Sequence, residues 1–304
     1  MREFVSNIKP GSWAAWKIAF RPKTLWIATV PVICAASLAF AQQYTIHLPS
    51  LILAMLCAVM IQVITNLQND VGYTARGHET GARVGMPRAT QTGLLTPKQI
   101  RLGLLFCALV TMALGLPLVF WHGWPILMIG VASMVAAVLY MAGARPLAYT
   151  AWSEVVVFIF FGLVAVNGTT YLFTHQSLAA SWWLSIAIGL LAAAVLLVNN
   201  YRDIEHDRNT GRRTLVVTLG MQKSQVIYAL MIFTPFLLLL PLFYVSPFFS
   251  LAWLALPFAV RTFRTLVASN PGTHFNVIML NTVRLEALFG FLFTLGGVLA
   301  RIFP

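Results

Sequence analysis

Two short polar segments interrupt a chain that is otherwise strongly apolar. The first, NLQNDVGYT, covers residues 66–74, and the second, NNYRDIEHD, covers residues 199–207. Each contains an asparagine followed four residues later by an aspartate, and the second contains a further aspartate four residues beyond that. Side chains four residues apart lie on one face of a helix. If both segments are helical, each therefore presents a row of amide and carboxylate oxygens on one face.

The five side chains in these rows are those of Asn66, Asp70, Asn199, Asp203 and Asp207. Three carboxylates gathered in one cavity would repel one another unless a cation neutralised them. Mg²⁺ prefers such hard oxygen ligands, keeps several of its water molecules and is usually shared with phosphate groups of a substrate. If the two segments face each other, they predict a Mg²⁺ site.

Arginines surround the same two segments. They are Arg76, Arg83, Arg88, Arg202 and Arg208. Because a guanidinium binds phosphate oxygens through two parallel hydrogen bonds, acids and arginines together predict a Mg²⁺–diphosphate site. The alternative is that these are ordinary helix-end charges in contact with caps and lipid headgroups. That alternative accounts for isolated residues such as Glu154, but not for two matching spacings.

The composition indicates what kind of protein must hold these segments. Of the 304 residues, 59% are hydrophobic and 9% are charged, whereas soluble domains carry roughly 25% charged residues. This favours a membrane protein with many spans. The net charge of +12 is spread between apolar runs and forms no dense basic stripe, so nucleic-acid binding is disfavoured. The three cysteines lie in apolar runs and predict neither disulfides nor a zinc site.

Hydropathy predicts an all-α, polytopic fold of nine transmembrane helices in a bundle. A helical span needs about 20 mostly apolar residues, and helices satisfy their own backbone hydrogen bonds in lipid. The predicted spans cover residues 24–41, 48–67, 102–120, 125–142, 153–172, 182–200, 225–243, 247–263 and 283–300. Both polar segments come at the end of an even-numbered span.

The distribution of basic residues predicts the orientation. If the N-terminus is cytoplasmic, nineteen of the twenty lysines and arginines lie on the cytoplasmic side, and Arg301 is the exception. Such a bias follows the positive-inside rule. Both polar segments then lie at the cytoplasmic face. The outer loops contain His47, His122 and His175, for which the sequence predicts no cluster and no role.

The matching segments also suggest an internal duplication. Asn66 and Asn199 are 133 residues apart, and membrane proteins are often built from repeated halves. We therefore expect a single domain over residues 1–304, with pseudo-repeat halves of approximately 1–145 and 146–304.

Four longer stretches resemble the UbiA superfamily of intramembrane prenyltransferases nearly end to end. They are RPKTLWIATVPV (21–32), RVGMPRATQTGLLTPKQ (83–99), RPLAYTAWSEVVVFIFFGLVAVNGTTYL (145–172) and NNYRDIEHDRNTGRRTLVVTLG (199–220). The last is the most specific, and it resembles the branch that prenylates 1,4-dihydroxy-2-naphthoate in menaquinone biosynthesis.

The resemblance implies a central cavity capped by cytoplasmic loops and open sideways to lipid. It implies Mg²⁺-dependent transfer of a polyprenyl group from its diphosphate to an aromatic acceptor, with loss of CO₂. Asp70 and Asp203 would be catalytic, and the five residues of the two rows would hold the metal. Contacts to diphosphate or to the acceptor would come from Arg21, Lys23, Arg76, Arg88, Arg145, Tyr149 and Arg202. Aromatic rings beside the cavity would face the allylic cation: Tyr140, Tyr149, Phe158, Phe160 and Phe161.

The first segment departs from the family pattern, which commonly has a second acid after Asn-Asp. Here Tyr73 or Thr74 stands in its place. Either Glu79 supplies the ligand from the following loop, or the metal has fewer ligands, or activity is altered.

Three other functions remain open at this stage. A transporter or channel would place its ionisable groups near the middle of the spans, whereas here they collect at one face. A related prenyltransferase could use hydroxybenzoate, homogentisate or a lipid as acceptor, and a weakly active relative could only bind prenyl diphosphate. The sequence predicts neither the prenyl chain length nor the oligomeric state.

Overall fold

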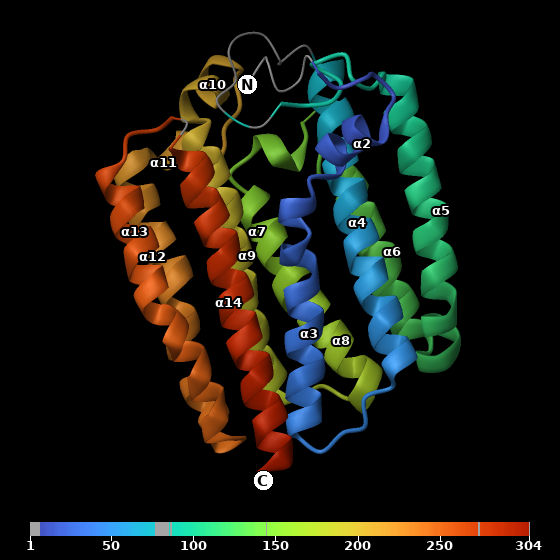
Figure 1. Cartoon of the computed structure of the whole chain (residues 1–304), viewed down its shortest axis with the longest axis vertical. Coiled ribbons are helices and arrows are strands. Elements are labelled where there is room, and N and C mark those ends of the chain that lie inside the picture. Colours follow the sequence, from blue (N-terminus) through green and yellow to red (C-terminus); the bar gives the residue numbers. More distant parts are fainter. Residues whose placement is uncertain (1–6, 77–84, 86, 144, 273, 304) are drawn as a thin grey trace.

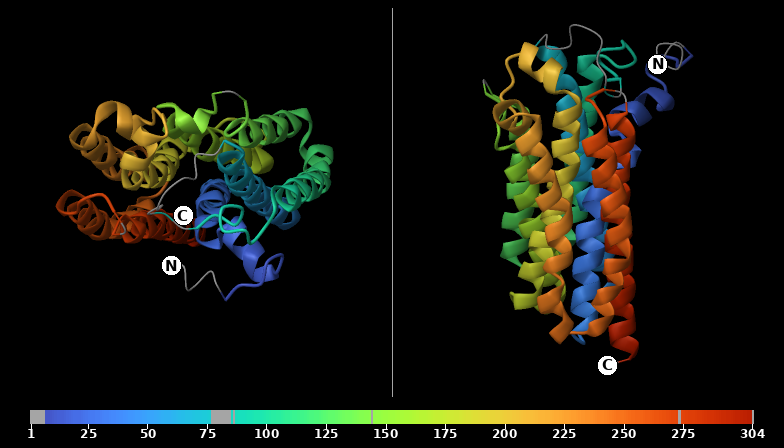
Figure 2. Two further views of the ribbon diagram at one scale, coloured as in Figure 1. Left: turned by 90° about the horizontal axis from the view of Figure 1, so that it is seen from above. Right: turned by 90° about the vertical axis from the view of Figure 1, so that its left-hand side faces the viewer.

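The computed structural model describes residues 7–76, 85, 87–143, 145–272 and 274–303, which contain helices and loops but no strand. The long helices run side by side as one bundle (Figure 1). Seen from above, they form an elongated ring (Figure 2). The prediction of an all-α fold is confirmed.

Each predicted span corresponds to a helical segment in the described part of the chain. The first four are α3 (Trp26–Ala41), α4 (Leu48–Ala75), α5 (Pro97–His122) and α6 (Trp124–Leu139). The fifth runs through α7 (Ser153–Val157), the π-helix η3 (Phe158–Val164) and α8 (Ala165–Thr174), and the sixth is α9 (Ala179–Arg202). The seventh joins α12 (Met221–Leu237) to the 3₁₀ helix η4 (Leu240–Tyr244). The eighth joins η5 (Pro247–Ala255) to α13 (Leu256–Ala268), and the ninth is α14 (Phe275–Ile302).

Among the described residues, seven helical segments are long and apolar enough to cross a membrane. An eighth is a bent pair, in which α2 (Trp13–Phe20) and η1 (Pro22–Thr24) meet α3 at an angle of 45°. The remaining predicted span, α6, is a shorter apolar helix. The small helices α10 (Ile204–Asn209) and α11 (Leu215–Leu219) lie at the same end of the bundle as α2 (Figure 1).

The two polar segments differ in local structure. Helix α4 continues to Ala75, so that Asn66 and Asp70 share a helical face as predicted. Helix α9 ends at Arg202, Asp203 caps it with non-helical angles (φ −96°, ψ 12°), and α10 starts afresh at Ile204. The prediction of one helical face through residues 199–207 is therefore wrong beyond α9.

Helix α9 is the most buried of the spans, and it packs closely against the π-helix η3. The two helices come close together at Gly162 of η3 and Gly189 of α9. A Cβ atom on Gly162 would lie 2.7 Å from the Gly189 Cα atom and would also contact the Ser185 carbonyl oxygen. Both neighbours are backbone, so they have little room to move.

Three histidines, His47, His122 and His175, lie close together, contrary to the expectation that they form no cluster. His47 precedes α4, His122 ends α5 and His175 follows α8. The Ser50 hydroxyl lies 2.7 Å from both His47 Nδ1 and His122 Nε2, and the His122 and His175 rings stack with centroids 5.4 Å apart. The prediction that they form no cluster is wrong, because the loops of three spans converge at this end of the bundle.

We expect Gly162→Ala to destabilise the protein by about 1–3 kcal/mol, because the added methyl group overpacks a backbone contact. Thermal unfolding of the purified protein in detergent would measure the loss. The matched control is Gly130→Ala on α6, where a Cβ atom meets nothing within 4 Å. There the better helix propensity of alanine should leave stability equal or higher by up to about 1 kcal/mol. Equal losses in both variants would contradict the close-packing explanation.

Candidate active site

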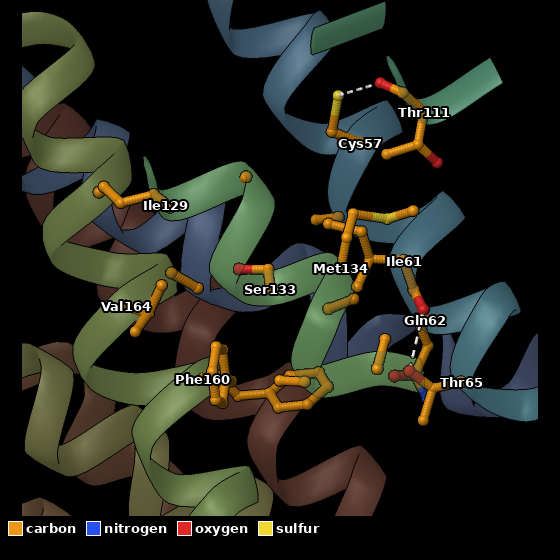
Figure 3. A pocket seen from close by; sticks show the side chains of 18 of the residues that line it. Cys57, Ile61, Gln62, Thr65, Thr111, Ile129, Ser133, Met134, Phe160 and Val164 are labelled. Carbon is orange, nitrogen blue, oxygen red and sulfur yellow. Dashed lines mark hydrogen bonds between the residues drawn. The ribbon is translucent and has the colours of Figure 1, made fainter. Parts of the chain in front are cut away.

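A cavity of about 560 Å³ lies inside the bundle. Its wall combines residues of α3, α4, α5, α6, η3, α8 and α9. Figure 3 shows Cys57, Ile61, Gln62 and Thr65 of α4 on one side and Phe160 and Val164 of η3 on the other, with Ser133 and Met134 of α6 between them. Most of the lining is apolar.

One end of the cavity is polar. It lies where α4 and α9 finish, and its side chains are Arg21, Thr24, Gln62, Thr65, Asn66, Asn69 and Asn199. Further along, the wall is partly open. Leu116 of α5 and Leu127 and Val131 of α6 line the cavity and are also exposed on the outside of the bundle. An apolar ligand could therefore enter sideways, from lipid.

The first polar segment contributes two kinds of group. Asn66 lines the cavity, and its Nδ2 atom donates to the Phe20 carbonyl oxygen at 2.9 Å. Asp70 is fully buried, and its carboxylate accepts hydrogen bonds from the backbone amides of Ala89 (2.9 Å) and Thr90 (3.0 Å) and from the Thr90 hydroxyl. Asp70 thus fixes the loop that follows Arg88.

Asn69 lines the cavity, although the four-residue spacing of Asn66 and Asp70 does not predict it as a site residue. Its Oδ1 atom is buried without a hydrogen-bond partner. The Gln62 side chain, two turns earlier on α4, also lines the cavity, and its Oε1 atom is likewise buried without a hydrogen-bond partner. Since a buried acceptor without a donor costs about 1–3 kcal/mol, these oxygens favour a ligand that brings donors or a positive charge.

The second polar segment is organised by Arg202. Its guanidinium binds both oxygens of Asp203, with Nε–Oδ1 2.8 Å and Nη2–Oδ2 2.7 Å, and Nη2 also donates to Asn199 Oδ1 at 2.9 Å. Arg202 and Asp203 are both buried. Arg202 therefore binds a carboxylate in this structure, although the resemblance also suggests it as a phosphate ligand.

Asp207 forms an ion pair with a different arginine, Arg212. Both side chains are buried. Arg212 Nη2 also donates to the Ala148 carbonyl oxygen at 2.8 Å, which ties this segment to the loop between α6 and α7. The sequence offers no signal for this role, because the contact depends on how distant loops fold together.

Arg88 is buried, and burial lowers the pKa of its guanidinium, while Tyr73 and the carboxylates of Asp70 and Asp203 act in the opposite direction. The end of α4 meets the loop after α10 at Tyr73, whose ring contacts both Arg88 and Arg212.

Tyrosine rings pack against these arginines. The Arg88 Cζ atom lies 3.3 Å from the centroid of the Tyr73 ring, and the Arg212 Cζ atom lies 5.1 Å from it. Tyr149 is 5.5 Å from Tyr73 between centroids, and both Arg76 and Arg212 approach its ring. Burial raises the pKa of Tyr149 to about 12. We call Tyr73, Tyr149, Arg76, Arg88 and Arg212 the arginine–tyrosine cluster.

Of the remaining residues predicted to contact the substrates or the metal, some line the cavity and others do not. Arg21 lines the polar end of the cavity. Lys23 and Arg145 are exposed and do not line it. Thr74 donates to the Asp70 carbonyl oxygen at 3.3 Å and contacts the Thr90 hydroxyl at 2.6 Å. Glu79 and Arg83 lie outside the described residues.

Three of the five predicted aromatic rings line the cavity. They are Tyr140, Phe160 and Phe161. Phe158 packs against Gly189, and Tyr149 belongs to the arginine–tyrosine cluster. Phe160 and Phe161 are neighbours in sequence and lie in the π-helix, whose wider turn changes the direction of side chains.

The oxygen atoms at the polar end fit Mg²⁺ in their chemistry. The described residues contain no group of three or more histidine, cysteine, aspartate or glutamate side chains arranged to hold a metal ion. Asn66, Asn69 and Asn199 line the cavity, however, and Asp70 and Asp203 follow them on the same two segments. A Mg²⁺ ion here would draw on amide as well as carboxylate oxygens, both of which are hard ligands.

We expect Asp207→Ala to destabilise the protein by about 3–5 kcal/mol, because it leaves the buried Arg212 charge without its carboxylate. Denaturation in detergent would measure the loss. Glu205→Ala is the matched control in the same helix, since the Glu205–Arg208 pair is exposed, at 3.4 Å. It should change stability by less than about 0.5 kcal/mol. Similar effects in both variants would contradict the assignment of Asp207–Arg212 as a structural pair.

Comparison with known proteins finds close relatives over the whole chain. The model of the UbiA prenyltransferase family matches residues 28–275. The 1,4-dihydroxy-2-naphthoate octaprenyltransferase of Escherichia coli (strain K12) is 33% identical over 94% of this chain and 96% of its own length. The protein of the same name from Bacillus subtilis (strain 168) is 30% identical, over 92% and 91%.

Solved structures share the fold. A UbiA homolog from Archaeoglobus fulgidus bound to DMAPP and Mg²⁺ has a TM-score of 0.65 at 14% identity, over 95% of this chain and 99% of that one. A UbiA homolog from Aeropyrum pernix K1 has a TM-score of 0.69 at 14% identity, over 91% and 98%.

Proposed function

This chain belongs to the UbiA prenyltransferase family, and we propose that it transfers a polyprenyl group from polyprenyl diphosphate to 1,4-dihydroxy-2-naphthoate. The product is demethylmenaquinol, and CO₂ is released. The observation that carries this proposal is the cavity, which joins a polar end rich in amide oxygens to a long apolar wall open toward lipid. An amphipathic substrate with an anionic head and an isoprenoid tail matches both parts.

The diphosphate belongs at the polar end. There Arg21 lines the cavity, and Arg88 is held beside the end of α4, over the Tyr73 ring. A fixed positive charge stabilises the charge that develops on the leaving diphosphate, and preorganised groups of this kind contribute much of the rate in many enzymes.

The residues that would hold Mg²⁺ are Asn66, Asn69 and Asn199, which line this end, and Asp70 and Asp203, which follow on the same two segments. Asp207, also predicted as a ligand, is paired with Arg212. When bound, Mg²⁺ supplies Lewis-acid stabilisation of the phosphate oxygens. Asp70 also holds the loop that carries Arg88, through the amides of Ala89 and Thr90. Its proposed role is therefore both ligand and anchor.

The aromatic wall suits the carbon chemistry. As the allylic C–O bond breaks, its electron pair leaves with the diphosphate and positive charge develops on the prenyl carbon. The faces of Tyr140, Phe160 and Phe161 offer negative potential without a nucleophile, and the apolar lining excludes water. A carbon of the electron-rich naphthoate ring then forms the new C–C bond. CO₂ and the carboxyl proton leave, and the ring becomes aromatic again.

We further propose that the protein is a multi-pass protein of the bacterial cytoplasmic membrane with its polar end toward the cytoplasm. The bias of nineteen of twenty lysines and arginines supports this orientation. The duplication of halves 1–145 and 146–304 stays a prediction, supported by the matching Asn–Asp spacing.

The decisive experiment gives purified protein in lipid a labelled polyprenyl diphosphate, Mg²⁺ and a panel of acceptors. We expect product with 1,4-dihydroxy-2-naphthoate, and little with hydroxybenzoate, homogentisate or a glycerol lipid. Asp70→Ala and Asp203→Ala should lower the rate at least about 100-fold, because each removes a carboxylate that we propose holds the Mg²⁺ ion on the leaving diphosphate. Glu205→Ala, on the exposed side of α10, is the control. Preferred transfer to another acceptor would change the substrate assignment, and no transfer to any acceptor would reject the proposed reaction.

A further inference from the structure

We propose that Tyr73 is a positioning residue, whose ring holds the Arg88 guanidinium in place for the diphosphate without neutralising it. This inference rests on the proposed function. It concerns one of the two positions, 73 and 74, at which the sequence departs from the family pattern, and it assigns position 73 to a different task from metal binding.

The contact between the two side chains is close and buried. The Arg88 Cζ atom lies 3.3 Å from the Tyr73 ring centroid, and the two residues are 5% and 7% exposed. A cation over an aromatic face is attracted by the ring quadrupole, and the attraction is stronger where water is excluded. The ring therefore stabilises one position of the guanidinium.

Neighbouring residues fix the positions of both Arg88 and Tyr73. The loop with Arg88 is fixed by Asp70, which accepts from the next two backbone amides. On the other side, the Tyr73 ring lies beside Tyr149 and within 5.1 Å of the Arg212 Cζ atom. Arg212 is in turn anchored by Asp207 and the Ala148 carbonyl oxygen. The ring thus connects α4 to loops from the second half of the chain.

The charge of the site explains why a ring differs from an acid here. The buried aspartates of the two segments are already compensated: Asp203 and Asp207 by the buried Arg202 and Arg212, and Asp70 by two backbone amides and a hydroxyl. A carboxylate at position 73 would add a negative charge within a few ångströms of Arg88 and Arg212. It would hold them by ion pairing, but it would also weaken their attraction for an anionic diphosphate. A neutral ring positions the Arg88 guanidinium without weakening its attraction for diphosphate.

The test compares Tyr73→Phe, Tyr73→Leu and Tyr73→Asp in the transfer assay. Tyr73→Phe keeps the ring face, so its KM for prenyl diphosphate should stay within about twofold. Tyr73→Leu should raise that KM, and the inhibition constant of inorganic diphosphate, about tenfold, with a smaller change in kcat. Tyr73→Asp should raise the KM and also the Mg²⁺ concentration that gives half-maximal activity.

Two controls separate positioning from general packing. Tyr228→Leu removes another buried ring, one that bonds to Thr282 on α14 away from the arginine–tyrosine cluster, and it should leave the KM unchanged. The double variant Arg88→Ala/Tyr73→Leu should be no worse than Arg88→Ala alone, because Tyr73 acts through Arg88. If Tyr73→Leu does not fold, Tyr73→Met removes the ring face while keeping more of the bulk.

The outcomes distinguish the alternatives. An unchanged KM in Tyr73→Leu would show that the ring is only core packing. Higher activity or a lower Mg²⁺ requirement in Tyr73→Asp would show that position 73 is a weakened metal-ligand position. Either result overturns this inference while the wild-type protein still transfers prenyl groups, whereas no transfer by the wild type would reject the proposed function itself.

Discussion

Buried charge must be compensated, and this constraint shapes the polar end of the molecule. Asp70, Asp203 and Asp207 are all buried, and an isolated buried carboxylate would cost several kcal/mol. Asp70 is stabilised by two backbone amides and a hydroxyl, and the other two by Arg202 and Arg212. Each of these contacts joins segments that the bundle alone would leave apart or fixes the chain where a helix ends. The loops over the cavity are therefore ordered by the same charges that we propose bind substrate.

The rest of the bundle provides what those charges need, a dry space beside them. Helix α9 is mostly buried, while α5 and α6 expose large apolar side chains on the outside of the bundle. Between them lies a cavity whose apolar wall includes both neighbours Phe160 and Phe161, placed there within a π-helix. Charge–charge interactions are stronger where water is excluded. The apolar wall and the charged end therefore act together. The wall excludes water and so strengthens the interactions between charges, and the polar end binds the head group of an otherwise apolar ligand.

The properties that the sequence predicts well are those that depend on local periodicity. Each of the nine spans predicted from hydropathy falls on a helical segment of the described residues, seven of them long enough to cross a membrane, and the four-residue spacing correctly places Asn66 and Asp70 on one face of α4. The same spacing fails beyond Arg202, because the chain leaves the helix at Asp203. Arg212 and Asn69 were not predicted as site residues, and the outer histidines were not predicted to cluster. The roles of Arg212 and of the histidines come from contacts between distant loops, and that of Asn69 from the position of the cavity beside α4, which neither periodicity nor residue type reveals.

The two polar segments also show that a repeated spacing need not mean a repeated structure. In the second segment, arginines bind the carboxylates directly, and the helix breaks between them. In the first, the helix is continuous, the carboxylate binds backbone amides, and the nearby arginine packs on a ring. A guanidinium can be held by its edge, through hydrogen bonds, or by its face, through an aromatic ring. In the edge mode a carboxylate compensates the positive charge, whereas a neutral ring adds no negative charge. The two segments therefore hold their buried arginines in different ways: Arg202 and Arg212 against carboxylates, and Arg88 against an aromatic ring.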